Sequence, residues 1–318
     1  MKKNKFHFKT MWDKVGTIII FFFMLIVFSF FAPKNFLSSR NLLQIATQSS
    51  VTLLLACGEF FAILIGGIEL SIGSVAALCG MVSAQLMTEL GMNYILAFII
   101  GSVLMGALCG LINGTLINIT GVHPFIITLG TQSVFRALTL IISNAKAWFG
   151  FDAKFTKMLG GLWNGISMSI IVALVVALFV WFLTTKTTFG RNLYVLGGNR
   201  DAAWFSGINV KTHVLAVHVI ACTCAGIAGA VLTSRLGAAE PNAAVGYETE
   251  AIAATVIGGT SFFGGKGKIP GVIIGALVLG LINNGLTMCS VPTFYQSLAT
   301  GLLLIAAVAL DTAIARAK

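Results

Sequence analysis

A glycine-rich stretch near the end of the chain has the residue types of a phosphate-binding loop. It runs IGGTSFFGGKGKIPG, from Ile257 to Gly271. A phosphate loop needs the spacing G-x-x-x-x-G-K-[ST], because backbone N–H groups, a lysine and a metal-binding hydroxyl must all reach the nucleotide. Counting from Lys266, the first glycine position holds Thr260, and Gly267 stands where Ser or Thr is needed. The stretch therefore does not predict a nucleotide site.

The other residues that could do chemistry are polar side chains inside long apolar runs. An ionisable residue in such a run is a functional candidate, although a hydrogen bond that pins two helices explains a single Asn equally well. Candidates to line a path for a polar solute are Glu59, Glu69, Gln85, Asn113, Asn118, Gln132, Asn283, Asn284 and Gln296. Glu59 is the strongest, because it lies well inside an apolar run. Arg136 also falls inside one, and an ion pair with an acidic residue such as Glu59 would explain it.

The remaining reactive residues predict no active site. None of the cysteines forms a C-x-x-C pair, so we expect them to be small packing residues that hold no metal. His123, beside Pro124, is expected to be structural and His218 to be a packed polar residue. No H-E-x-x-H, paired Asp cluster or Ser/His/Asp arrangement stands out. We therefore expect a protein that is not an enzyme.

Composition explains why the polar residues stand alone. Of the 318 residues, 57% are hydrophobic and only 9% are charged, and the mean hydropathy is +0.96. A soluble domain has about 25% charged residues, so this chain could not cover itself with polar surface in water. Apolar runs of about 20 residues predict membrane-spanning helices, because barrel strands would alternate over about 10. The expected fold class is an all-α integral membrane protein.

The apolar runs predict about ten spans in one transmembrane domain, residues 1–318. They are 16–32, 42–65, 71–88, 93–118, 125–143, 165–184, 214–235, 250–263, 270–288 and 294–312. An even number places both termini on one side, and the excess of basic residues there makes that side cytoplasmic. The basic residues of that side are Lys2, Lys3, Lys5, Lys9, Lys14, Lys186, Arg191, Arg200, Lys211, Lys266, Lys268, Arg316 and Lys318. The turn at 66–74 would face the same side, and the short eighth span could be a broken helix.

An internal repeat relates two of the expected spans. GALCGLINGTLINITGVHPF begins at Gly106, and GALVLGLINNGLTMCSVPTF begins at Gly275, with a one-residue insertion between the registers. By the span count the first block starts outside and the second inside, which is the signature of an inverted repeat in a transporter. Helices rich in Gly, Ala and Leu also resemble each other by composition. The alignment of Asn113 with Asn283 favours a true repeat, because Asn is costly in hydrocarbon without a partner.

The longest polar stretch inside the chain is TTFGRNLYVLGGNRDAAWFSGINVKTH, residues 187–213, here called the coupling segment. Gly197–Gly198 would break the chain, and Asn199 can cap a helix. Arg200–Phe205 would form about two turns that end at Ser206–Gly207. A short amphipathic helix between glycines suits docking into a groove on another protein. A solvated connector would not need the apolar run AAWF.

This segment resembles the cytoplasmic coupling loop of permeases in ABC importers for ribose, galactose, xylose and allose, whose members read GRN(I/L)YAxGGNxxAAxxSGI(N/D)V. The resemblance extends in order through GGIELSIGS, HPFIITLGT, RLGAAEP, YETEAIAATVIGGTSFFGGKGKI and INNGL, and covers nearly the whole chain. CGEFFAILIGGIELS, residues 57–71, is most similar to the allose-transporting members. Glu69 is a departure, because most relatives have Asp at that position.

The resemblance implies a pore-forming subunit that moves a monosaccharide, allose or a related sugar such as ribose, across the bacterial cytoplasmic membrane. It implies a separate ATPase that binds the ATP, so that this chain has no cofactor of its own. It also implies an extracytoplasmic sugar-binding protein and a second permease copy, as a homodimer in the lipid membrane, and gives no role to nucleic acid.

Both kinds of contact can be assigned to residues of this chain under that resemblance. The sugar path would use Glu59, Glu69, Asn113, Gln132, Asn283, Asn284 and Gln296. The ATPase would contact Gly197, Gly198, Asn199, Arg200, Asp201, Ala202, Ala203, Phe205, Ser206 and Gly207. In this arrangement Arg200 and Asp201 dock by polar contacts, with Ala202, Ala203 and Phe205 in the groove.

Two other classes of protein could use the same composition. An ion-coupled secondary sugar transporter would share the inverted repeat and use Glu59 or Glu69 as its proton site; uptake abolished by a protonophore while ATP is intact would favour it. An integral membrane enzyme would need a catalytic constellation at one membrane face, and the sparse polar residues do not supply one.

Overall fold

The computed structural model describes residues 2–32 and 35–316, and most of them are helical. Side chains are described at 16–32, 35–309 and 311–312, so the terminal basic residues of the expected charge pattern lie outside the described side chains. Within the described residues, β1 (Leu162–Trp163) and β2 (Ile166–Ser167) form a small antiparallel hairpin.

Six helical stretches are long and apolar enough to cross a membrane. They are α2 (Ser39–Leu64), the continuous run of α4 (Tyr94–Phe98), the π-helical turn η1 (Ile99–Leu104) and α5 (Met105–Thr120), α6 (Pro124–Ser143), α8 (Met168–Lys186), α11 (Val210–Leu236) and α13 (Ile269–Met288). Shorter apolar stretches lie in α1 (Lys2–Phe31), in α3 (Ile72–Thr88) and in α14 (Thr293–Arg316). The chain is therefore a multi-pass membrane protein.

Each expected span overlaps a helix of the structure, but the eighth overlaps a helix that is too short to cross a membrane. The eighth span, expected at 250–263, is α12 (Tyr247–Ile257), which has 11 residues. A helix that crosses a bilayer needs about 20 residues, so α12 alone is too short. It ends in a turn at Gly258–Gly259, where Gly259 has a φ of 87° that an L side chain rarely adopts.

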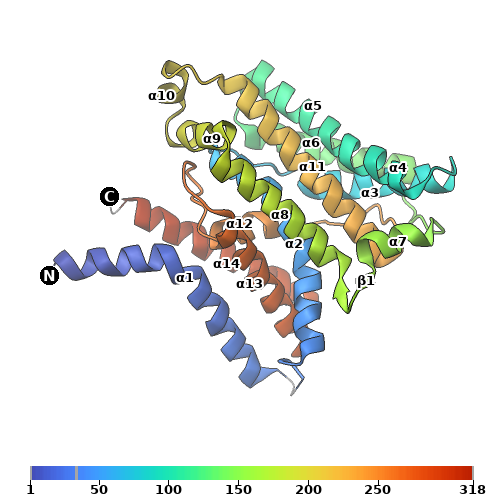
Figure 1. Ribbon diagram of the computed structural model, residues 1–318, viewed down its shortest axis with the longest axis horizontal. Helices are drawn as coiled ribbons and strands as arrows, with labels where there is room; N and C mark the ends of the chain where they lie inside the picture. Colours follow the sequence, from blue (N-terminus) through green and yellow to red (C-terminus); the bar gives the residue numbers. More distant parts are fainter. Residues whose placement is uncertain (1, 33–34, 317–318) are drawn as a thin grey trace.

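The long helices define two ends of the molecule (Figure 1). One end carries α9 (Thr188–Gly198) and α10 (Arg200–Phe205), and the opposite end carries α7 (Ala153–Gly160) and the β1–β2 hairpin. The start of α1 and the end of α14 lie toward the α9–α10 end.

Helix α2 forms the centre of the bundle, and its side chains from Ser49 to Leu64 are all buried. It packs against α11, α13, α12 and α8. An apolar face on every side is what a helix surrounded by other helices requires. The polar residues of α2 are consequently enclosed by protein, and Glu59 is fully buried.

Small residues let the neighbouring helices approach closely. On α5, Gly106, Gly110 and Gly114 recur every four residues and face the backbone of α11. A Cβ at Gly106 would lie 2.5 Å from the carbonyl oxygen of Cys222, and one at Gly110 would overlap the carbonyl of His218. Such small-residue stripes drive helix association where lipid provides no hydrophobic force.

Candidate functional site

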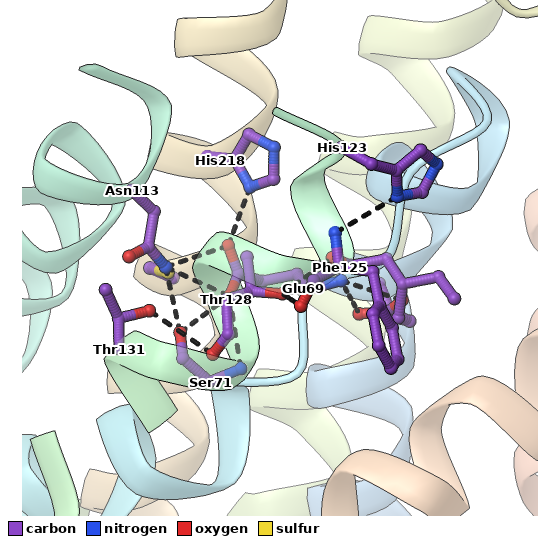
Figure 2. A network of polar contacts seen from close by, with 11 residues as sticks. Glu69, Ser71, Asn113, His123, Phe125, Thr128, Thr131 and His218 are labelled. Atoms are coloured by element: carbon purple, nitrogen blue, oxygen red, sulfur yellow. Dashed lines mark hydrogen bonds and ion pairs between the residues drawn. The ribbon is translucent and has the colours of Figure 1, made fainter. Parts of the chain in front are cut away.

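A sealed polar network lies between the α2–α3 turn, α5 and α11. Its members are Glu59, Glu69, Ser71, Asn113 and His218, and all of them are fully buried. Figure 2 shows the Glu69 carboxylate at its centre, with Asn113 and His218 reaching it from different helices. Because α2 ends at Leu64 and α3 begins only at Ile72, the intervening turn carries Glu69 into the interior.

The Glu69 carboxylate is fully occupied by donors. Its oxygens accept hydrogen bonds from Ser71 Oγ at 2.6 Å and from Asn113 Nδ2 at 3.0 Å, and His218 Nδ1 lies 2.6 Å from Oε2. The Ser71 backbone N–H donates as well, at 3.1 Å. These donors fix the position of the Glu69 carboxylate, and the contact with His218 is an ion pair when His218 is protonated.

Glu59 joins the network through the backbone. Both of its carboxylate oxygens accept from the Glu69 N–H, at 3.2 and 3.3 Å. The expected ion pair between Glu59 and Arg136 is not what the structure contains. Arg136 Nη1 instead donates to the carbonyl oxygens of Pro241, at 2.7 Å, and Ala243, at 2.9 Å. Arg136 therefore fixes the loop before α12.

The close contact of α5 and α11 explains how Asn113 and His218 meet Glu69. The glycine stripe of α5 brings the two backbones together beside these side chains. Asn113 Oδ1 and His218 Nε2 are buried without a hydrogen-bond partner among the described residues. His123 lies nearby and caps α6, where its Nδ1 accepts from the Phe125 N–H at 3.3 Å. The structural role expected for His123 is confirmed, and His218 is a fully buried polar residue, as expected, whose Nδ1 contacts Glu69.

A second polar cluster surrounds the carboxylates of α12. Glu248 accepts from Gln132 Nε2 at 3.0 Å. Glu250 accepts from Thr52 Oγ1 at 3.1 Å and from Asn283 Nδ2 at 3.4 Å. Thr52 is buried, whereas both carboxylates and both amides are only half-buried. Gln132 and Asn283 therefore belong to a different and less buried cluster than the sealed network.

The other candidate path residues lie apart from both clusters. Asn284 pairs with Asn41 through two amide hydrogen bonds, at 3.0 and 3.1 Å. Gln296 donates to Thr287 Oγ1 and to the Val291 carbonyl. Each of these contacts links consecutive or neighbouring helices, as a pinning hydrogen bond does. Gln85 and Asn118 likewise donate to backbone carbonyls, those of Ile142 and Lys211.

The coupling segment has the helix caps that its sequence predicts. Asn199 Oδ1 accepts from the Ala202 N–H at 2.9 Å and starts α10, and Gly207 follows its end with a φ of 79°. The break before α10 lies at Asn199, one residue later than expected, because Gly197 and Gly198 still belong to α9. A hollow between α10 and the start of α11 is lined by Arg200, Asp201, Trp204, Gly207, Ile208, Asn209, Val210 and Lys211.

The apolar residues of α10 face in two directions. Ala203 is fully buried within the chain, so it cannot also fill a groove on a partner, contrary to the expectation for it. Trp204 and Phe205 are 65% and 79% exposed, and their rings meet edge to face. Ala202, Arg200 and Asp201 are exposed as well. The outward face of α10 is thus an aromatic pair flanked by charged residues.

Glycines join the coupling segment to the centre of the bundle. A Cβ on Gly197 would overlap the Leu64 carbonyl oxygen and lie 2.6 Å from the Gly265 nitrogen. The Gly265 N–H donates to that same carbonyl at 2.9 Å. Tyr194 Oη donates to the Gly267 carbonyl at 2.9 Å, and burial raises the pKa of Tyr194. The glycines of the 257–271 stretch thus let α9 and the end of α2 meet.

Sequence reasoning did not select several residues that the structure brings into the polar clusters or onto the exposed face of α10. They are Thr52, Ser71, His218, Glu248 and Glu250 in the clusters, and Trp204 on α10. His218 and Glu250 are polar residues inside predicted spans, so the rule that selected Glu59 could have selected them. Glu248 lies outside the predicted eighth span, because that span was expected to start at residue 250. Trp204 could not be distinguished from its apolar neighbours by residue type.

Comparison with known proteins agrees with the resemblance seen in the sequence. Residues 41–308 match a family model described as the permease component of a branched-chain amino acid transport system. The chain is 52% identical over 315 residues to the D-allose transport system permease protein of Escherichia coli K12, covering 99% of this chain and 96% of the relative. It is 39% identical over 312 residues to the ribose import permease protein of Bacillus subtilis 168, covering 98% and 96%.

A third relative, the galactose/methyl galactoside import permease protein of Salmonella typhimurium LT2, is 35% identical over 326 residues, covering 97% of each chain. No solved structure matches this chain. These relatives are transport permeases rather than enzymes. With the matched family model covering most of its helices, this chain belongs to the family of transport-system permease components that includes sugar permeases of ABC importers.

Proposed function

We propose that this chain translocates D-allose, or a related monosaccharide such as ribose, across the bacterial cytoplasmic membrane, and that a separate ATPase docked on α10 drives the movement. The proposed docking of the ATPase rests on the exposed pair Trp204–Phe205, which lies on a capped helix outside the bundle. Exposed aromatic residues on a short helix suit insertion into a groove. The choice of allose rests on the relative with 52% identity.

The same proposal includes the membrane arrangement. Ten helical segments would cross or enter the membrane, α12 as a half-helix, with both termini on the cytoplasmic side together with α10. The aligned Asn113 and Asn283 support an inverted repeat, because each donates its amide to a carboxylate of the neighbouring broken segment. A second copy would complete the path as a homodimer, and a sugar-binding protein would deliver the solute. ATP would be held by the ATPase, and this chain would need no cofactor.

Uptake of labelled sugar tests this function. Cells would express the chain with its ATPase and binding protein, and a parallel strain would carry an inactive ATPase. We expect ATPase-dependent uptake of D-allose that unlabelled allose blocks better than ribose or galactose. ATPase-dependent uptake of another sugar would show that allose is not the substrate and would leave the proposed mechanism intact. Uptake that persists with the inactive ATPase would contradict the energy source.

An ion-coupled transporter is the second candidate, and the sealed network favours it. Glu59, Glu69 and His218 are ionisable groups inside the membrane domain, as in the proton relays of pumps and transporters. A protonophore added while cellular ATP is maintained distinguishes the two mechanisms. It would abolish ion-coupled uptake and leave ATPase-driven uptake intact.

A further inference from the structure

The amino ends of α3 and α12 meet inside the membrane domain. Gly73 lies in the first turn of α3, and a Cβ there would be 2.5 Å from Glu248 Oε2 and 2.6 Å from the Ala244 carbonyl oxygen. Glu248 and Glu250 lie in the first turn of α12. Broken helices whose ends meet within the bilayer form solute sites in other transporter folds. The turn of α12 that carries both carboxylates is therefore a place where a solute could be held.

Side chains from three further helices converge on these carboxylates. Gln132 reaches Glu248 from α6, Thr52 reaches Glu250 from α2, and Asn283 reaches it from α13. These hydrogen-bond partners are neutral amides and a hydroxyl. Such donors orient a carboxylate without neutralising its charge. A cluster of this kind has hydrogen-bonding capacity left for a polar solute.

The two Asn–Glu pairs of the internal repeat differ in exposure. Asn113 and Glu69 are fully buried, and Glu69 has two further side-chain partners in Ser71 and His218. Asn283 and Glu250 are only half-buried. The first pair is sealed by the surrounding helices, so a sugar could reach it only if these helices separated. The second pair is open to whatever lies beside α12.

A carboxylate that is only partly buried on a membrane helix restricts what can lie beside it. Facing hydrocarbon would be costly for Glu248 and Glu250, whereas facing a water-filled path is not. We propose that Glu248, Glu250, Gln132 and Asn283 line an aqueous path and bind the hydroxyl groups of a neutral monosaccharide, with the second permease copy closing the path. This inference rests on the proposed sugar transport and adds the site of contact.

The chemistry of the four residues fits a sugar. Each carboxylate oxygen can accept from more than one hydroxyl, and each amide both donates and accepts. A neutral sugar brings no charge, so it would contact these side chains through the hydrogen bonds of its hydroxyl groups. Hydrogen bonds to charged groups are stronger than those between neutral groups, and a site with few of them binds loosely enough to release its solute. Arg136 fixes the loop before α12 through the Pro241 and Ala243 carbonyls and is an electrostatic neighbour of Glu248.

Cysteine labelling tests the aqueous path directly. In full-length protein carrying Cys289→Ser, the remaining native cysteines, Cys57 among them, are buried and provide an internal unlabelled background. We expect Glu250→Cys to react with a charged, water-soluble thiol reagent in membrane vesicles, and D-allose to slow the reaction. Val175→Cys is the matched control, because Val175 is 60% exposed on the apolar helix α8 and would face lipid.

Transport provides the second measurement, on Glu250→Gln, which keeps the shape and removes the charge. We expect sugar uptake to fall about tenfold, the effect of one lost charge-assisted hydrogen bond, while the ATPase activity of the assembled complex stays unchanged. If Glu250→Cys is not labelled, the proposed site is wrong, and the proposed function is unaffected. The same holds if Glu250→Gln takes up sugar normally while the parent chain transports. If the parent chain takes up no sugar, the proposed function is wrong. If Glu250→Cys is labelled but D-allose does not slow the reaction, the proposed contact with the sugar is wrong.

Discussion

Replacing Gly197 by Ala is the sharpest test of how the coupling segment is joined to the bundle. The added Cβ would lie 2.6 Å from the Gly265 nitrogen and overlap the Leu64 carbonyl oxygen. Ordinary contacts need about 3.5 Å, so α9 would have to move by more than about 1 Å away from the end of α2. Both neighbouring atoms are backbone and cannot turn aside. Overpacking of this kind costs about 1–3 kcal/mol.

Gly198 provides a matched control one residue further along the same helix. A Cβ at Gly198 meets nothing within 4 Å, and Ala is favoured over Gly in a helix by up to about 1 kcal/mol. We therefore expect Gly198→Ala to be neutral or slightly stabilising.

The assay measures sugar uptake and ATP hydrolysis together, in proteoliposomes containing the permease, its ATPase and the binding protein. We expect Gly197→Ala to hydrolyse ATP with little uptake, because α10 would still dock while its link to α2 is displaced. The melting temperature in detergent should fall as well. If Gly197→Ala and Gly198→Ala behave alike in both assays, the close contact at Gly197 has no role in coupling.

Three further predictions follow from the site. Trp204→Ala and Phe205→Ala should reduce ATPase binding and ATPase-dependent uptake at least about tenfold, since buried aromatic anchors contribute 2 kcal/mol or more to interfaces; unchanged ATPase pull-down would contradict this. His218→Ala should destabilise the chain by about 1–3 kcal/mol, because the buried Glu69 carboxylate loses a hydrogen-bond partner, and an unchanged melting temperature in detergent would disprove it. Gly110→Ala should lower folded yield by separating α5 from α11, whereas Gly130→Ala, with open space around it, should not.

Local features of the chain could be predicted because local rules decide them. The positions of the membrane helices follow from apolar runs, and the start of α10 follows from the Asn199 cap. The two glycine pairs at 197–198 and 264–265 could be recognised as places of special backbone, but their purpose could not. They meet each other only because α9 crosses the end of α2.

Exposure was the property that sequence reasoning could not supply. Glu59 and Glu250 are both acidic residues in apolar surroundings, and residue type gives no reason to separate them. The structure seals the first within the bundle and leaves the second half-buried. The same holds in α10, where Ala203 turns inward and Trp204 outward.

The sequence by itself determined the class of protein, the approximate helices and the family, because hydropathy, helix caps and motifs are properties of neighbouring residues. Only the tertiary structure decided which polar residues act together. Glu69 and His218 are 149 positions apart, and they meet because the glycine stripe of α5 brings α11 close to the α2–α3 turn. Contacts over that separation depend on how whole helices pack, and no local pattern encodes that packing.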